Sequence, residues 1–267
     1  MAQDVTRSDG RTKPEVGPQD ATTNPFEAYD EKVAAADLRR YRMNGPRPWT
    51  RTLLEALKAE GVEDATLLDI GGGIGVIQHE LLAAGVTSAM NVDASSAYLD
   101  AAQAEGDRRG HAGRVRYEHG DFVELAGSIP RADIVTLERV LNVYPDWEEL
   151  ASLSAEHARL LYAVVVPRDT GFVKLVIFVM NLVLRLRRQE VRAAVIPIDA
   201  LDRVVREKGL SRSFSQAVGA AWQVALYRRD EGVDAGSGEI LVSATVMDLV
   251  DGSGLNFEDA PIPRSTS

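Results

Sequence analysis

The chain has 267 residues, of which 45% are hydrophobic and 26% are charged, an ordinary composition for a globular protein with a full core. Forty acidic residues against thirty basic ones give a formal net charge of -10, which argues against nucleic acid as the main partner and favours a small or membrane-associated substrate. Because the sequence contains no cysteine, disulfide bonds, thiolate nucleophiles and cysteine-ligated metal sites are excluded, and a cytoplasmic location is expected.

The N-terminal residues are polar and rich in Pro, Gly and charge, and they lack the apolar core of a secretory signal. We therefore predict a disordered leader over residues 1–24. Two segments with helical spacing of apolar residues follow, at residues 26–42 and 49–61, so that two helices precede the first strand.

Beyond these helices, apolar runs of strand length alternate with helical patterns. The strands are predicted at residues 65–70, 88–93, 114–121, 132–137 and 162–167. The helices among them are predicted at residues 75–85, 96–106 and 146–161, the last of them capped by Asp146. This alternation indicates parallel strands joined by right-handed crossovers, with helices on both faces of the sheet.

Near the C-terminus, residues 211–218 and 220–229 read as two strands separated by little more than Gly219. So short a link predicts an antiparallel hairpin at one edge of the sheet, after a helix at residues 199–209 capped by Asp199. The predicted fold is α/β, a doubly wound, mostly parallel seven-stranded sheet with an antiparallel C-terminal hairpin.

Between the fifth strand and that helix lies "FVKLVIFVMNLVLRLRR", residues 172–188. Its apolar run, Leu175 to Leu184, is shorter than the roughly 20 residues that a membrane-spanning helix needs. A helix here with several arginines at its end could cover a substrate cleft, make a peripheral contact with a membrane surface or pack against another subunit. The alternative is a buried helix whose basic residues lie at its C-terminal dipole.

The segment "LLDIGGGIG" places Gly71, Gly73 and Gly75 directly after the first strand, at the edge of the sheet where ligands bind. Backbone without side chains can contact a ligand closely, and the N–H groups that begin the next helix attract negative charge. The spacing departs from the dinucleotide-binding fingerprint, because Val76 or Gln78 stands where its third glycine should be, and this disfavours a nicotinamide oxidoreductase.

"LLDIGGGIG" resembles the first motif of class I S-adenosylmethionine-dependent methyltransferases. The resemblance implies one domain with the Rossmann-like methyltransferase fold over residues 25–229, an enzyme, and S-adenosylmethionine as its cofactor. Carried over to this sequence, it implies cofactor contacts by Asp69, Gly71, Gly73, Gly75, Asp93, Asp121, Phe122 and Glu138.

The acidic residues of this set lie at or near the ends of successive strands, and each has an alternative reading without a role in cofactor binding. Asp93 can accept hydrogen bonds from the two ribose hydroxyls, or it caps the next helix. Asp121 lies in a stretch that resembles the family's adenine-binding segment, with Phe122 beside the ring, or it forms a turn. Asp69 is expected at the methionine end of the cofactor, near its ammonium group, and Glu138 at the same end. The alternative for both is a solvated carboxylate.

The segment "LERVLNVYPDWEEL" is similar to magnesium-protoporphyrin O-methyltransferases and their relatives, which implies O-methylation of a carboxylate or hydroxyl on a small molecule. The side chains expected around the acceptor are Tyr29, Tyr41, Arg139, Asn142, Tyr144 and Asp146. Tyr29, Arg139 and Tyr144 are the candidate catalytic residues, and Arg139 is suited to a bidentate contact with an acid. The four histidines lack ligand spacing, so no metal site is expected.

Residues 230–267 are expected to form a separate C-terminal tail. Within it, residues 238–259 resemble the end of class III nucleotide cyclase domains, but without the catalytic or metal-binding residues of those enzymes, so no cyclase activity is inferred. A tail this short cannot bury a core by itself. An alternative function for the whole chain is a regulatory or partner-binding module that keeps the cofactor fold without catalysis.

Overall fold

The computed structural model describes residues 30–186 and 192–230. The strands are β1 Thr66–Ile70, β2 Ser88–Asp93, β3 Val115–His119, β4 Ala132–Glu138, β5 Ala158–Pro167, β6 Leu210–Val218 and β7 Trp222–Arg229. The helices are α1 Glu31–Asn44, α2 Pro48–Glu60, α3 Val76–Leu82, α4 Ser96–Arg108, α5 Phe122–Leu125, α6 Trp147–His157, α7 Gly171–Leu186 and α8 Ile198–Arg206, with short 3-10 turns at η2 Ala126–Ser128 and η3 Leu141–Val143. The leader expected at residues 1–24 and the cyclase-like segment lie outside the described residues.

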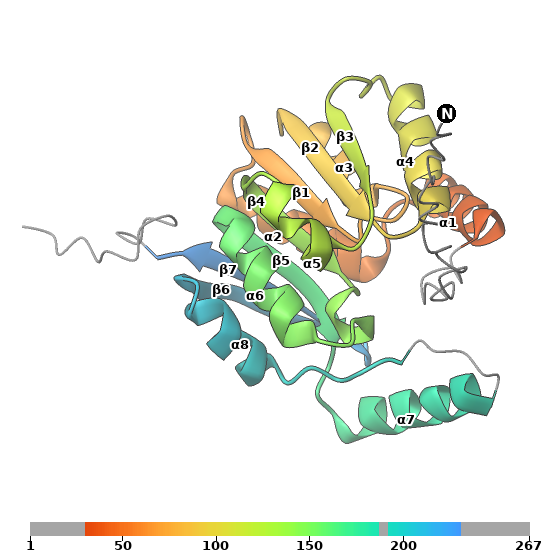
Figure 1. Cartoon of the computed structure of the whole chain (residues 1–267), viewed down its shortest axis with the longest axis vertical. Helices are drawn as coiled ribbons and strands as arrows, with labels where there is room; N and C mark the ends of the chain where they lie inside the picture. The colour runs from red at the N-terminus through yellow and green to blue at the C-terminus, as the bar shows by residue number, and fades with distance from the viewer. Residues whose placement is uncertain (1–29, 187–191, 231–267) are drawn as a thin grey trace, which may run out of the picture.

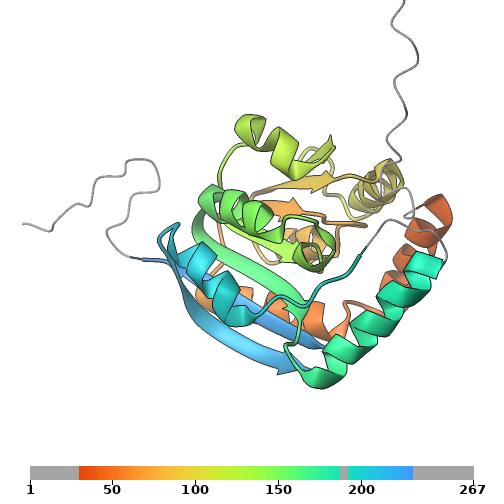
Figure 2. The same cartoon turned by 60° about the horizontal axis from the view of Figure 1, so that its bottom comes forward.

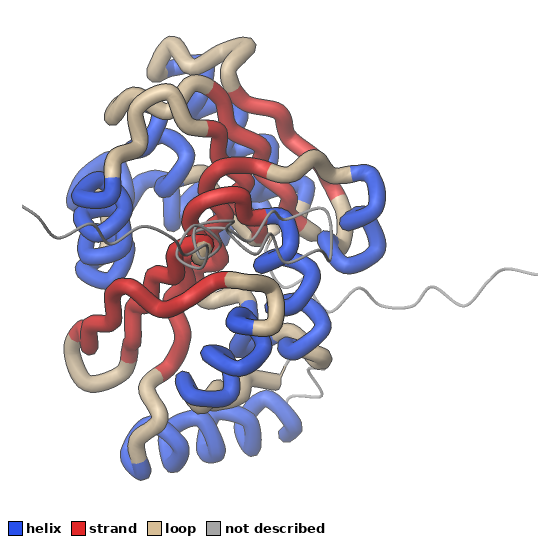
Figure 3. Tube along the Cα trace, turned by 90° about the vertical axis from the view of Figure 1, so that its left-hand side faces the viewer, coloured by secondary structure: helices blue, strands red, loops and turns tan. Residues whose placement is uncertain are grey.

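One seven-stranded sheet runs through the molecule in the order β3-β2-β1-β4-β5-β7-β6 (Figure 1). The first five strands pair in parallel, and β7 pairs antiparallel with both β5 and β6. Helices flank the sheet on either side, as Figure 3 shows in blue around the red strands. This confirms the predicted doubly wound, mostly parallel sheet with an antiparallel C-terminal hairpin.

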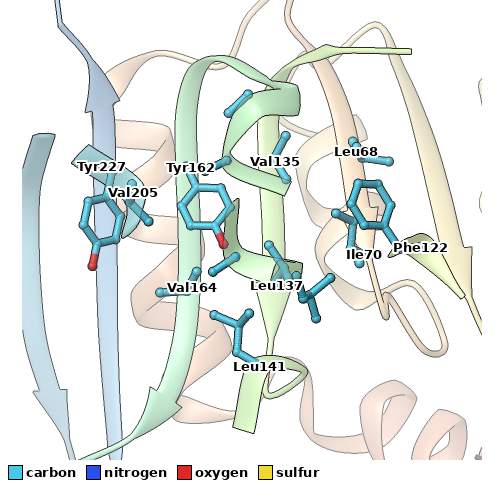
Figure 4. Packing of buried hydrophobic residues seen from close by; sticks show 14 of the residues in the cluster. Leu68, Ile70, Phe122, Val135, Leu137, Leu141, Tyr162, Val164, Val205 and Tyr227 are labelled. Atoms are coloured by element: carbon cyan, nitrogen blue, oxygen red, sulfur yellow. The ribbon is translucent and has the colours of Figure 1, made fainter. Parts of the chain in front are cut away.

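Two hydrophobic clusters, one on each face of the sheet, form the core. In β5, Ala163 and Val165 pack with α2 and α3, whereas Tyr162 and Val164 point to the opposite face, with α6 and α8. Figure 4 shows this second layer, in which Tyr227 of β7 lies beside β5. Because β5 is covered on both faces, all its residues from 161 to 167 are buried, which explains the uninterrupted apolar run in the sequence.

The strand order reverses between β1 and β4, which are neighbours in the sheet but are followed by helices on opposite faces. The loops that leave the carboxyl ends of these strands therefore diverge and open a crevice between them. This topology places Gly71 to Gly75, after β1, and Arg139, after β4, at the same edge of the sheet.

Helix α1 begins later than the predicted helix at residues 26–42, because Asp30 caps it by accepting hydrogen bonds from the N–H groups of Lys32 and Val33, at 2.9 and 3.0 Å. The helix packs against α4. There the carboxylate of Glu105, fully buried, accepts a 2.8 Å hydrogen bond from Arg42 of α1. Arg108 and Arg109 also donate to Glu105, and these contacts hold its pKa well below the usual range.

Two local predictions are wrong. The helix expected over residues 146–161 ends at His157, and the strand expected from residue 162 starts at Ala158, because Ala158 already pairs with Ala132 of β4. The helix expected at residues 199–209 is α8, which begins one residue earlier after Pro197 and has no side-chain cap. Proline with its fixed φ can start a helix without a capping side chain, so Asp199 lies in the first turn instead.

Candidate functional site

A cleft of about 330 Å³ opens at the carboxyl ends of β1, β2 and β4. It is lined by most of the side chains and loop positions that the sequence singles out: Asp69, Gly71, Gly73, Asp93, Asp121, Phe122, Glu138, Arg139 and Tyr144. Gly75 is absent from the lining and instead occupies the N-cap position of α3. The structure therefore brings residues from four different strand ends into one cavity.

The glycines after β1 serve two different purposes. Gly71, Gly73 and Gly75 all have positive φ angles, of 63°, 54° and 77°, which glycine adopts without strain. A Cβ atom on Gly71 would overlap Val140, and one on Gly75 would lie 2.5 Å from Gln78 Nε2, so these two glycines are required by internal packing. A Cβ on Gly73 would meet no atom within 4 Å. Gly73 is therefore the position at which bare backbone faces open space in the cleft.

Asp93 fixes this loop to the end of β2. Its Oδ2 accepts a 2.9 Å hydrogen bond from the N–H of Gly73, and its Oδ1 accepts one of 2.8 Å from the N–H of Ser95. The N-cap of α4 is Ser95, whose hydroxyl accepts from the N–H of Tyr98, so Asp93 is not the helix cap. Burial raises the pKa of Asp93, and the two backbone hydrogen bonds oppose that shift. Each carboxylate oxygen retains a lone pair for a ligand.

Asp69 is almost fully buried, with 1% of its surface exposed, so the alternative of a solvated carboxylate at a strand end is wrong. Its Oδ1 accepts a 2.7 Å hydrogen bond from Thr136 Oγ1. Its Oδ2 has no hydrogen-bond partner among the described residues. Burial, with a smaller contribution from the charges of Glu138 and Asp93, raises the pKa of Asp69 to about 7. A buried acceptor without a partner at a cleft wall is suited to a cationic or hydrogen-bond-donating ligand.

We predict that Asp69→Asn stabilises the ligand-free chain at alkaline pH. The pKa of Asp69 in the folded state, about 7, lies above the usual value of 3.8 that applies to the unfolded chain. Between pH 3.8 and pH 7 the folded state therefore binds more protons than the unfolded state, so the free energy of unfolding falls as the pH rises. At pH 8 the variant is expected to gain at least about 1 kcal/mol in free energy of unfolding. The new amide can also donate toward Asn91 Oδ1, another buried atom without a partner among the described residues. The two oxygens, Asp69 Oδ2 and Asn91 Oδ1, lie near each other, because each is 2.7 Å from a Cβ placed on Gly72.

Urea unfolding of both proteins at pH 5 and pH 8 tests this expectation. At pH 5 the wild-type carboxyl is protonated in the folded state, so most of the gain should vanish. Asp100→Asn, which changes an exposed carboxylate of α4, is the matched control and should show no such pH dependence. An equal effect of Asp69→Asn at both pH values would show that the buried charge carries no cost.

Glu138, the last residue of β4, is held by helix α2. Its Oε1 accepts hydrogen bonds from Trp49 Nε1 at 2.7 Å and Thr50 Oγ1 at 3.0 Å. Burial raises the pKa of Glu138, so it is not the solvated loop carboxylate that the sequence left open. Asp69, which is buried, and Glu138, which is partly buried, together place two carboxylates on the cleft wall.

Asp121 and Tyr144 form a hydrogen-bonded pair across the cleft. Asp121 caps α5 by accepting from the N–H of Val123 at 2.9 Å, and Tyr144 donates its hydroxyl to Asp121 Oδ2, also at 2.9 Å. Burial and the Asp121 carboxylate raise the pKa of Tyr144, so its hydroxyl remains protonated and acts as a donor. Phe122 lies next to this pair, buried, with its ring 5.2 Å from His157 in an edge-on contact.

Arg139 stands at the mouth of the cleft in a strained backbone conformation. Its φ of 62° is left-handed, which is uncommon for a residue other than glycine and is often found at functional sites. The guanidinium lies 5.6 Å from the ring centre of Trp49 and 5.1 Å from that of Trp222. The two indole rings are 5.2 Å apart. The side chain is exposed and forms no salt bridge with a described carboxylate, so its N–H edge is available to an anion.

Helix α1 and the link that follows it contribute three charged cleft residues that the sequence did not reveal: Asp37, Arg40 and Arg47. Asp37 accepts from Tyr98 at 3.0 Å and pairs with Arg47 at 3.3 Å. Arg40 Nε is buried without a hydrogen-bond partner, and burial lowers the pKa of Arg40. Asp37 and Arg40 share one face of a predicted helix, but no feature of the sequence indicates that this helix covers the cleft.

Several expected acceptor residues lie elsewhere. Tyr41 is buried and donates its hydroxyl to Glu80 at 2.6 Å, and Asp146 caps α6 by accepting from the N–H of Glu149. Asn142 is buried beside the cleft, where its backbone carbonyl accepts from the N–H of Ala194. Tyr29 lies outside the described residues. Within the described ranges, no group of three or more acidic or histidine side chains could hold a metal ion.

Comparison with known proteins agrees with this geometry. Residues 67–163 match the family model described as a methyltransferase domain, which covers the stretch from β1 into β5. No curated protein matches the chain in sequence. The match in sequence is therefore to a methyltransferase domain over this stretch, and other similarities are found in structure.

Three solved structures illustrate that relation. Magnesium protoporphyrin IX methyltransferase from Synechocystis PCC 6803 with bound SAH has a TM-score of 0.57 at 16% identity, covering 84% of this chain and 90% of that one. The same enzyme with bound SAM gives 0.59 at 15% identity, covering 79% and 100%. An O-methyltransferase family protein from Burkholderia thailandensis gives 0.58 at 18% identity, covering 77% and 62%. At these identities the similarity shows a shared fold.

Proposed function

We propose that this chain transfers the methyl group of S-adenosylmethionine to an oxygen atom of a small acidic molecule, and that a carboxylate is the preferred acceptor. The methyltransferase domain makes the chain an enzyme, and S-adenosylmethionine is its methyl donor. The observation that carries the acidic acceptor is the set of three arginines that line one cleft: Arg40, Arg47 and Arg139.

The residues at the inner part of the cleft fit the donor. The open space over Gly73 admits a ligand against the main chain. In this proposal Asp93 accepts from the ribose hydroxyls and the buried, unpartnered Oδ2 of Asp69 accepts from the amino group. Asp121 and Phe122 contact the adenine, and Glu138 adds negative charge at the amino end. We place this domain over residues 25–229.

The chain contributes to the reaction mainly by positioning the two reactants and by excluding water. When bound, S-adenosylmethionine would supply a methyl group on a positively charged sulfur, and S-adenosylhomocysteine would leave as the acceptor oxygen bonds in line to the methyl carbon. Arg139, whose guanidinium lies beside two indole rings, orients the acid at the cleft mouth. A carboxylate is already ionised and needs no general base, which agrees with a described lining that contains no histidine. Tyr144 acts as a positioning residue, because its hydroxyl is engaged with Asp121.

The test measures turnover of methyl-labelled S-adenosylmethionine with a panel of small carboxylic acids and phenols. A methyl ester releases labelled methanol in mild alkali, whereas a methyl ether does not, so this treatment identifies the acceptor atom. Calorimetric titration with S-adenosylhomocysteine runs in parallel. Donor-product binding without turnover on any acceptor would instead favour a non-catalytic regulatory module.

For the acceptor that turns over, Arg139→Ala is expected to raise KM at least about tenfold, because it removes a charged hydrogen-bonding group at the cleft mouth. Affinity for S-adenosylhomocysteine should be unchanged. Arg139→Lys keeps the charge but loses the planar fork, so it should recover only part of the loss. An unchanged KM in Arg139→Ala would remove this residue from the acceptor site.

A further inference from the structure

Helix α7 leaves an apolar surface uncovered. Its exposed hydrophobic side chains, between 41% and 76% accessible, are Phe172, Leu175, Val176, Phe178, Val179, Met180, Leu182, Val183 and Leu186. Val173 is the one buried residue of this helix. In Figures 1 and 2, α7 lies outside the layers that flank the sheet. Contiguous exposed apolar surface of this kind marks a site of interaction with a protein or a membrane.

The helix has a defined inner face, which fixes the direction of the outer one. Asn181 donates its side-chain amide to the carbonyl of Ala193 at 2.7 Å and accepts from the N–H of the same residue at 3.0 Å. Val173, eight residues earlier on the same helical face, is buried. The exposed apolar side chains lie around the remainder of the helix, away from Asn181, so they form one outward face.

We propose that α7 docks on the surface of a lipid bilayer that contains anionic headgroups. Its 16 residues span about 24 Å, less than the hydrocarbon core of a bilayer. Among the described residues no helix is long and apolar enough to cross a membrane. An apolar face with basic residues beside it is the pattern of a helix that lies in the membrane interface.

The charges on the helix favour lipid over a second copy of the chain. Lys174 and Arg185 are its charged residues, and no acidic side chain lies within it. A second copy of this helix would therefore offer no acidic side chain of its own to pair with Arg185. Lys174 is paired with Asp169 at 2.6 Å, whereas Arg185, in the last turn, is exposed and forms no ion pair among the described residues. Anionic headgroups complement this basic end.

Helix α7 lies at the same end of the sheet as the cleft. The helix begins four residues after the end of β5, and Val165 of β5 is paired with Glu138, which lines the cleft. Docking therefore brings the sheet edge that carries the cleft toward the bilayer. If the proposed function holds, the enzyme can take an amphipathic acid directly from the lipid, and this consequence alone rests on that function.

Flotation of the full-length chain with vesicles tests the proposal without donor or acceptor, so its outcome is independent of methyl transfer. The chain should float with vesicles of phosphatidylcholine mixed with phosphatidylglycerol, and less with phosphatidylcholine alone or at high salt. A triple variant, Phe172→Gln, Leu175→Gln and Phe178→Gln, should lower the partition coefficient at least about tenfold. These side chains are exposed, so the variant is expected to fold.

Met43→Gln, which changes an exposed apolar residue on α1, is the matched control and should bind as the wild type does. Arg185→Gln should weaken binding to the anionic vesicles and leave binding to phosphatidylcholine unchanged. Failure of the wild-type chain to float, or equal flotation of the triple variant, overturns the proposal. A wild-type dimer that the triple variant converts to a monomer, without vesicle binding, would identify α7 as a contact between copies instead.

Discussion

Gly73→Val should reduce affinity for S-adenosylhomocysteine at least about a hundredfold, because bulky atoms would fill the space in which a ligand meets the bare main chain. In the ligand-free structure a Cβ on Gly73 meets no atom within 4 Å, so the variant introduces no clash with the protein itself. Calorimetric titration measures the affinity, and circular dichroism shows whether the fold is retained.

The positive φ of Gly73 adds a separate cost, since valine in a left-handed conformation is strained. Gly113→Val controls for it. Gly113 also has a positive φ and no atom within 4 Å of an added Cβ, but it lies in the link before β3, at the opposite edge of the sheet. Gly113→Val should lose stability without losing affinity. If both variants bind the ligand as the wild type does, the cleft over Gly73 is not the donor site.

Asp93→Ala is expected to weaken S-adenosylhomocysteine binding about tenfold to a hundredfold. The substitution removes the carboxylate assigned to the ribose, and it also leaves the N–H groups of Gly73 and Ser95 without their acceptor. The second effect loosens the glycine loop and should lower the free energy of unfolding by about 1 to 3 kcal/mol. Calorimetry below the unfolding transition separates the loss of affinity from the loss of stability.

Asp93→Asn distinguishes the two roles further. The amide keeps one oxygen acceptor in nearly the same shape, so much of the stability should return, while the charge available to the ribose hydroxyls is lost. Ser95→Ala removes the cap of α4 and leaves Asp93 in place, so it should lower stability alone. Wild-type affinity in Asp93→Ala would contradict the assignment of this carboxylate to the donor.

The order and type of the sheet elements were predictable because β5 and its neighbours are buried on both faces. A strand covered on both faces must be apolar throughout, and residues 162–167 show this directly in sequence. Residues 158–161 were assigned to the preceding helix because their apolar pattern also fits a helical turn. These residues form a strand because Ala158 pairs with Ala132, a contact that no local sequence pattern predicts.

The residues of the cleft also differ in how far the sequence predicts them. Asp69 and Asp93 were identifiable because they lie at the carboxyl ends of β1 and β2, next to the glycine loop, where a doubly wound sheet forms its ligand cleft. Arg40 was not, because its place in the cleft depends on how α1 packs against α4. That packing includes the ion pair between the exposed Arg42 and the buried Glu105, 63 residues further along the chain, and a pair of this separation leaves no periodic signal.

Trp49 and Trp222, whose ring centres lie 5.6 and 5.1 Å from the Arg139 guanidinium, give the cleft mouth an intrinsic optical reporter. Trp147, the third tryptophan of the chain, packs against the hydrophobic cluster on the other face of the sheet, so it contributes a constant background. Any anion that draws the guanidinium off the indole faces alters the emission of two of the three fluorophores. Acceptors can therefore be screened by fluorescence on the unlabelled wild-type chain, before any of them is known to be methylated.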